Sequence, residues 1–246
     1  MMHLAVYTSN ITNGSVLLQV TQLADAILPP LNNGFQVMPD IPNLLMTAGV
    51  GTNLTRFQLT SGSIRKMFPW DFEQVNVGTL IGAPARYHDF TLNPIPLDLN
   101  EELDAFCVQS NAGAQREYVA VWLSDGPVAQ RNGRIQTIHG TLSTTLVANA
   151  WTGGTITLDN GLDGGTYAIV GARAFSAGGL FFRFIPRGGG NPKRPGGFMS
   201  QARDALPPPG QRYGGWGEWL RFTNIAVPQV EFLSISADRL KKSIST

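Results

Sequence analysis

The sequence is poor in charge and has one cysteine. Of its 246 residues, 14% are Asp, Glu, Lys or Arg, against about 25% in a typical soluble domain. Cys107 stands alone, so an intrachain disulfide is excluded. It lies in an apolar run, which favours a buried, unreactive thiol over a nucleophile. No apolar run reaches the roughly 18 residues of a membrane-spanning helix, so no transmembrane segment is predicted.

The N-terminus lacks the charged start and apolar centre of a secretory signal, so we expect synthesis in the cytoplasm. Residues 1–50 contain no Lys or Arg, and the net charge of the whole chain is +1. Strong direct binding to nucleic acid requires a basic face. The charge pattern therefore does not favour it.

Motifs that indicate catalysis or metal binding are also missing. His3, His88 and His139 lack the spacing of zinc ligands on one element. The sequence has no Gly-x-Ser-x-Gly frame, and the three glycines at 188–190 are not followed by Gly-Lys-Ser/Thr. We predict no enzyme activity, no catalytic residues, no metal site and no cofactor.

Carboxylates gather at Asp98, Glu101, Glu102 and Asp104. Such a group could bind calcium or supply the paired acids of a glycosidase. The spacing of a calcium-binding EF-hand is missing, however. The favoured interpretation is a solvated turn that keeps a sheet edge from pairing with other chains.

One amphipathic helix is predicted near the N-terminus. From Val16 to Leu28 the apolar residues follow the i, i+3, i+4, i+7 pattern of one helix face. Ser15 would cap this helix, and Pro29-Pro30 would end it.

The rest of the chain has the pattern of β structure. Four Asn-Gly pairs mark tight turns, and short runs of aromatic and β-branched residues separate them. The predicted fold is mainly β, an antiparallel β-sandwich with long loops. The candidate strands are 54–59, 104–109, 117–123, 135–138, 155–158, 166–174, 180–185, 219–222 and 230–235.

The stretch from Pro186 to Gly217 is the most unusual part of the sequence. Its 32 residues include nine Gly and six Pro, and it carries five basic residues against one acid. A connection much longer than the usual 4 to 6 residues or so is commonly functional or disordered. We interpret it as an assembly loop. The residues predicted to contact other subunits are Arg187, Lys193, Arg194, Arg203, Arg212, Tyr213 and Trp216.

Aromatic residues follow at the end of this loop. Tyr213 and Trp216 are of the types enriched at binding hot spots, and such rings also stack on sugars. Trp219 and Phe222 are predicted to return the chain to the core.

In overall style the sequence resembles the jelly-roll coat proteins of icosahedral viruses and bacteriophages. The resemblance rests on short strands broken by Asn-Gly turns, low charge, no signal, and a long Gly/Pro/Arg loop before a final strand pair. It implies a structural virion protein, a capsid subunit that binds copies of itself and other virion proteins. The missing basic N-terminal arm departs from many small RNA-virus coats.

The predicted organisation is an N-terminal arm over residues 1–50, with the helix at 16–28, followed by a β-sandwich region over 51–246. That region could comprise two β units meeting near 127–134, and it includes the assembly loop 186–217. Two alternatives remain open for the function. One is a phage receptor-binding or glycan-binding β-sandwich module, and the other is a carbohydrate-active enzyme on a β-sandwich.

Overall fold

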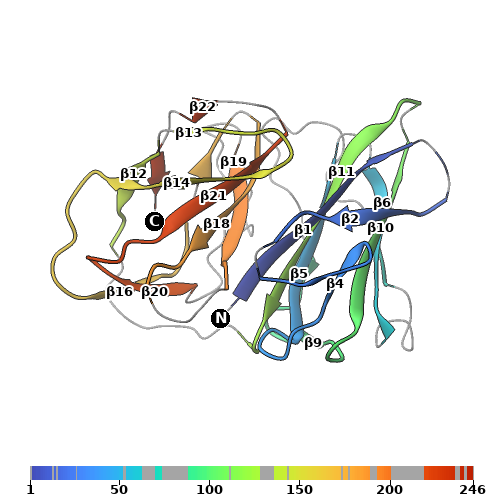
Figure 1. Ribbon diagram of the computed structural model, residues 1–246, viewed down its shortest axis with the longest axis horizontal. Coiled ribbons are helices and arrows are strands. Elements are labelled where there is room, and N and C mark those ends of the chain that lie inside the picture. Colours follow the sequence, from blue (N-terminus) through green and yellow to red (C-terminus); the bar gives the residue numbers. More distant parts are fainter. Residues whose placement is uncertain are drawn as a thin grey trace. The chain divides into compact units, whose positions relative to one another are not determined.

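The computed structural model describes most of the chain as strands joined by turns (Figure 1), and its described residues contain almost no helix. The residues that it describes are 2–12, 14, 16–25, 27–51, 54–62, 70–73, 88–110, 112–127, 136–142, 144–172, 174–176, 178–188, 193–200, 219–235, 239–240 and 243–245. The fold is mainly β, and its sheets are largely antiparallel, as predicted.

The chain divides into two compact units. His3–Pro127 form one, called here the N-terminal unit, and Met1–Met2 with Val128–Thr246 form the C-terminal unit. In Figure 1 the strands of the first are blue to green, and the strands after residue 128 are yellow to red.

The strands before the boundary are β1 (Met2–Ile11), β2 (Leu18–Gln22), β3 (Pro30–Leu31), β4 (Gly34–Gln36), β5 (Asn43–Val50), β6 (Leu54–Thr60), β7 (Trp70–Glu73), β8 (His88–Asp89), β9 (Ile95–Pro96), β10 (Glu102–Gln109) and β11 (Gln115–Ser124). Those after it are β12 (His139–Thr141), β13 (Thr144–Thr145), β14 (Trp151–Thr155), β15 (Thr157–Leu158), β16 (Thr166–Ile169), β17 (Ala174–Phe175), β18 (Gly179–Ile185), β19 (Gly196–Ser200), β20 (Leu220–Thr223), β21 (Gln229–Ser234), β22 (Arg239–Leu240) and β23 (Ser243–Ser245).

Strand β2 links two groups of strands in the N-terminal unit. It pairs with β1 at Tyr7↔Gln22 and with β10 at Ala105↔Val20. On the far side of β10 lies β6, and β11 pairs with β5 over seven residues of each strand's length. All of these pairings belong to one continuous network of hydrogen-bonded strands.

The core of the N-terminal unit follows from strand alternation. Along β10 the side chains of Leu103, Ala105 and Cys107 are buried, whereas those between them are half-buried. Along β11 the side chains of Val119, Val121 and Leu123 join the same apolar cluster. Side chains two residues apart lie on one face of a strand, so both strands contribute one face to a common core. Cys107 is buried, as predicted.

The predicted helix over Val16–Leu28 is wrong. Leu18–Gln22 form strand β2, in which Val20 is buried between the exposed side chains of Gln19 and Thr21. The backbone of this segment bonds to other strands, and Leu23 N–H donates to the Val6 carbonyl over 2.8 Å. Hydrogen bonds to partners on both sides outweigh a weak helical preference, which tertiary context commonly overrides.

The largest sheet of the C-terminal unit has the order β14-β21-β18-β19-β17. Strand β18 is central, between β21 and β19, and six of its seven residues are buried. Strand β19 lies inside the segment predicted as the assembly loop, so that segment is not irregular throughout. The β17–β19 pairing is parallel, and the other ladders of this sheet are antiparallel.

Aromatic rings form the packing on one face of this sheet. Trp219 is fully buried against Phe182 and Phe184, with ring centroids 6.1 and 6.2 Å away. The prediction that Trp219 returns to the core is confirmed. Phe222 is half-buried and stacks on Tyr167 at 5.7 Å.

Gly196 allows β19 to lie close to β18. A Cβ added there would come within 2.1 Å of the carbonyl oxygen of Phe182 and 2.7 Å of the Arg183 Cβ. We expect Gly196→Ala to lower the free energy of unfolding by about 1–3 kcal/mol, because the backbone must shift to relieve the overlap. Chemical denaturation measures this loss.

The matched control is Gly161→Ala, where an added Cβ meets no atom within 4 Å. We expect it to leave stability within about 1 kcal/mol of the parent, since reducing backbone freedom slightly favours folding. Equal stability of the two variants would show that β19 does not pack as described.

Candidate functional site

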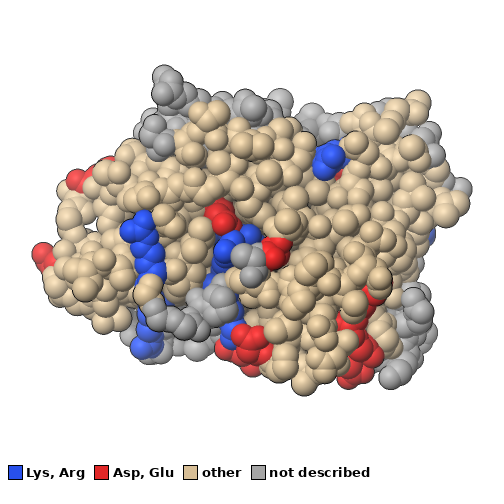
Figure 2. All heavy atoms as spheres, in the orientation of Figure 1, with Lys and Arg blue, Asp and Glu red and all other residues tan. Residues whose placement is uncertain are grey.

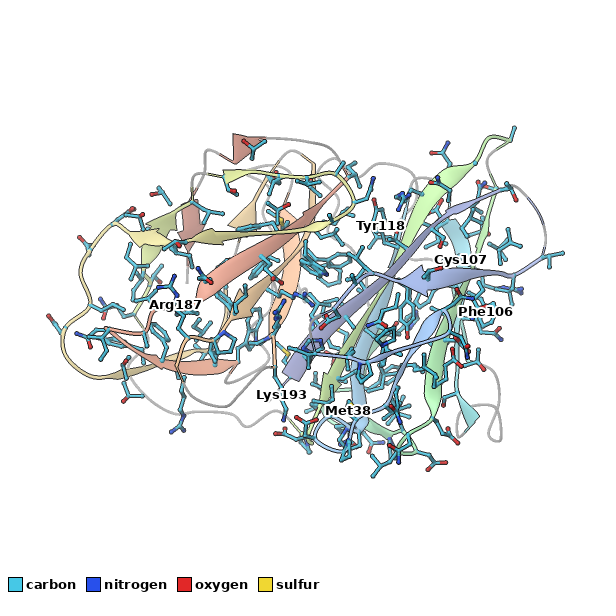
Figure 3. The ribbon with its side chains drawn as sticks, viewed as in Figure 1. Met38, Phe106, Cys107, Tyr118, Arg187 and Lys193 are labelled. Atoms are coloured by element: carbon cyan, nitrogen blue, oxygen red, sulfur yellow. The ribbon has the colours of Figure 1, made fainter. Side chains whose placement is uncertain are left out.

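Three of the predicted contact residues lie on the connection between β18 and β19 (Figure 3). Arg187 is exposed, Lys193 is buried, and Arg194 is half-buried. Arg203, Arg212, Tyr213 and Trp216 lie outside the described residues. The prediction that the last two form a recognition surface therefore stays a prediction.

Arg194 belongs to an ion-pair cluster inside the chain. Its Nη1 donates to both carboxylate oxygens of Glu231, each over 2.8 Å. Arg183 lies directly opposite Glu231 in the β18–β21 ladder, and its Nε donates to Glu231 Oε2 over 2.7 Å. One carboxylate thus binds two guanidinium groups, which come from different segments of the sequence.

Trp151 completes this cluster. The guanidinium carbon of Arg183 lies 4.0 Å from the centre of the Trp151 ring, the geometry of a cation–π contact. Arg183 is 1% exposed. A cation so deeply buried requires a paired charge, and Glu231 supplies it.

The cluster fixes the start of β19. Arg194 is two residues before Gly196, which pairs with Arg183 in the β18–β19 ladder. Phe184 N–H also donates to the Pro195 carbonyl over 2.8 Å. The ion pair and the ladder together hold the end of the connection to the sheet, so Arg194 has a structural role within the chain.

One member of this cluster is indicated by the sequence. Arg183 interrupts an otherwise apolar run from Phe181 to Ile185, which indicates a buried charge. Glu231 and Trp151 are distant in the sequence, and their association with Arg183 depends on strand order and register. Sequence reasoning therefore missed both.

Two of the four clustered carboxylates, Glu102 and Asp104, lie at the start of β10 and accept hydrogen bonds. Glu102 Oε2 accepts from Asn32 Nδ2 over 2.8 Å, and Asp104 Oδ1 accepts from Gln19 Nε2 over 2.9 Å. These bonds connect β10 to β2 and to the β3–β4 hairpin. Within the described ranges, no three His, Cys, Asp or Glu side chains are placed to hold a metal ion.

A buried His–Asp pair lies at the start of β1. His3 Nε2 and Asp25 Oδ2 are 3.2 Å apart, and both side chains are almost fully buried. The pair connects β1 to the segment after β2, so its geometry supports a structural role. The two residues are 22 positions apart, so no sequence pattern indicates that they pair.

Charged side chains are sparse on the face of the molecule in Figure 2. Several exposed large apolar side chains lie in the connections between strands. Leu92, between β8 and β9, is 93% exposed, and Ile225, between β20 and β21, is 90% exposed. Others in connections are Val16, Leu99 and Val147.

No family model, curated protein or solved structure matches this chain. Among the described residues, no helix has the length and apolar character needed to cross a membrane.

Glu231→Gln tests the ion-pair cluster. The amide keeps the shape of the side chain but removes the negative charge that Glu231 presents to the buried Arg183. We expect a loss of about 3–5 kcal/mol in the free energy of unfolding, as for other buried pairs that lose one partner. Urea denaturation at neutral pH measures it.

Asp163→Asn is the control, since Asp163 is an exposed carboxylate of the same unit. Exposed charges contribute little, so we expect a change below about 0.5 kcal/mol. A similarly small loss in Glu231→Gln would mean that Arg183 does not depend on this carboxylate.

Proposed function

We propose that the protein is a structural virion protein, a capsid subunit that self-assembles into a shell, and that its N-terminal unit is a jelly-roll-like β-sandwich. The observation that carries the assembly proposal is the surface, which is low in charge and has large apolar side chains in its connections.

The sandwich part of the proposal is supported by the course of β2. One strand pairs at one place with β1 and at another with β10, and side chains from β10 and β11 meet in one apolar cluster. In a sandwich, strands that pass from one sheet to the other form the corners, and the inner faces supply the core.

The exposed apolar side chains support assembly. Turns ordinarily carry Gly, Pro, Asn, Asp or Ser, yet Leu92 and Ile225 occupy such positions. Burying one such side chain against a neighbouring subunit contributes about 1.5–3 kcal/mol. Repetition of the same contact around a closed shell adds these modest energies together.

The test is assembly of the purified full chain. Size-exclusion chromatography with light scattering, followed by electron microscopy across salt and protein concentration, is expected to show ordered particles. Only a monomer or a small closed oligomer under all conditions would rule the proposal out.

Leu92→Glu and Ile225→Glu test the connections. Each places a charge where a neighbour would bury an apolar side chain. Losing about 1.4 kcal/mol of contact energy changes an association constant about tenfold. We expect each variant to raise the concentration needed for assembly by at least that factor, without changing the unfolding curve.

The control is Asn160→Glu, which adds the same charge at an exposed polar turn position. It is expected to assemble at the parent's concentration. If all three variants assemble like the parent, the exposed apolar side chains do not form the contacts.

A further inference from the structure

Glu117 is a buried carboxyl side chain in the core of the N-terminal unit. It is 0% exposed, and neither of its carboxyl oxygens has a hydrogen-bond partner among the residues that the structure describes. It lies on β11 two residues before Val119, whose side chain belongs to the apolar cluster. Alternation along the strand therefore places Glu117 at one end of that cluster.

Gly51 provides the space for this side chain. A Cβ added at Gly51 would lie 1.3 Å from Glu117 Oε2. No other side chain at this position could leave the carboxyl group where it is. The carboxyl group is thus packed against bare backbone and receives no hydrogen bond in return.

Among the described residues, no cation offsets the burial of Glu117, and its raised pKa comes from desolvation. The charge of Glu117 acts on two titratable groups, Cys107 on β10 and Tyr118 on β11, and adds to burial in raising the pKa of each. Gly49 of β5 pairs with Val119, two residues after Glu117, and its neighbours from β6 are the apolar side chains of Leu54 and Phe57. Figure 3 labels Cys107 and Tyr118, which mark β10 and β11 at this end of the core.

Other ionisable groups of these strands lie on other faces or farther along the core. Arg116 and Tyr118 flank Glu117 on β11 and point to the opposite face. Arg56 is on β6 next to Phe57, again on the opposite face. His88 lies farther along the core, because its strand partner Thr47 is four residues before Gly51 in the sequence. The hydroxyl of Tyr7 donates a hydrogen bond to the Leu103 carbonyl.

We propose that Glu117 is a pH-sensitive lock in the N-terminal unit: its neutral acid closes the core between β5, β10 and β11, and its ionisation opens that end of the core to water. Water has a short path to this carboxyl group, because the nearby β10–β11 turn at Ala112–Ala114 is exposed. Gln109 holds this turn through bonds to the Ile11 and Gly113 carbonyls.

The direction of the effect follows from proton binding. Burial raises the pKa of Glu117 from 4.5 to about 7. Between these values the folded chain keeps the proton while the unfolded chain has released it. Stability is therefore full below about pH 4.5, falls as the pH rises towards 7, and levels off above it.

The experiment compares the full-length parent with Glu117→Gln, which keeps the shape and cannot ionise. Urea unfolding is measured from pH 5 to pH 8. The folding constant of the parent, divided by that of Glu117→Gln, is expected to fall by roughly 70-fold over this range, given the two pKa values. An unchanged ratio would overturn the proposal.

The control is Asp40→Asn, which removes an exposed carboxyl of the same unit. Its ratio to the parent is expected to stay constant over the same range. A fall as large as that of Glu117→Gln would overturn the proposal, because it would mean that the effect belongs to carboxylates in general.

Hydrogen exchange keeps the proposal testable if Glu117→Gln does not fold. In the parent, protection of the amides of Val50, Gly51 and Tyr118 is expected to drop at least about tenfold from pH 6 to pH 8 after correction for intrinsic rates. Amides of β18 and β21 serve as the internal reference. Equal protection at both pH values would overturn the proposal.

Discussion

The double pairing of β2 is the constraint on which the N-terminal unit depends. Its backbone is shared between β1 and β10, so these two strands cannot move apart without breaking hydrogen bonds. The shared strand also sets register, and a slip of one residue would expose Val20 and bury Gln19. The apolar cluster that includes Ala105 and Val119 forms where this register brings the strand faces together.

The two units differ in whether a buried ionisable side chain has a partner of opposite charge. In the C-terminal unit, Arg183 is buried beside a carboxylate that also binds Arg194, so the charges are compensated. In the N-terminal unit, Glu117 has no hydrogen-bond partner within the described part of the chain, and burial raises its pKa. A compensated pair resists changes of pH near neutrality, whereas a lone buried carboxyl responds to them. The sensitivity to pH that we propose is therefore local to one end of one core.

The sequence predicted some strands of the second half and none in the first 50 residues. The predicted strand over 135–138 is wrong for 136–138, which precede β12, and the one over 166–174 ends at Ile169. Leu180–Ile185 and Val230–Ile235 are bounded by turn residues, and they match β18 and β21 within one residue at each end. β1 and β5 have no such alternation, because they are buried on both faces. The spacing around β2 fits a helix as well as a strand, and only its partners decide between them.

The ion-pair cluster was less predictable than the fold. Its residues are distant in the sequence, and only the pairing of the strands brings them together. Arg194 was predicted to bind another chain from composition alone, and the structure gives it a partner in Glu231 within the same chain. Among the described part of the loop, Arg187 is exposed. The proposed assembly contacts therefore depend more on apolar side chains such as Leu92 and Ile225 than on the basic loop. Because apolar burial rather than charge pairing stabilises contacts of that kind, screening by salt is not expected to weaken them.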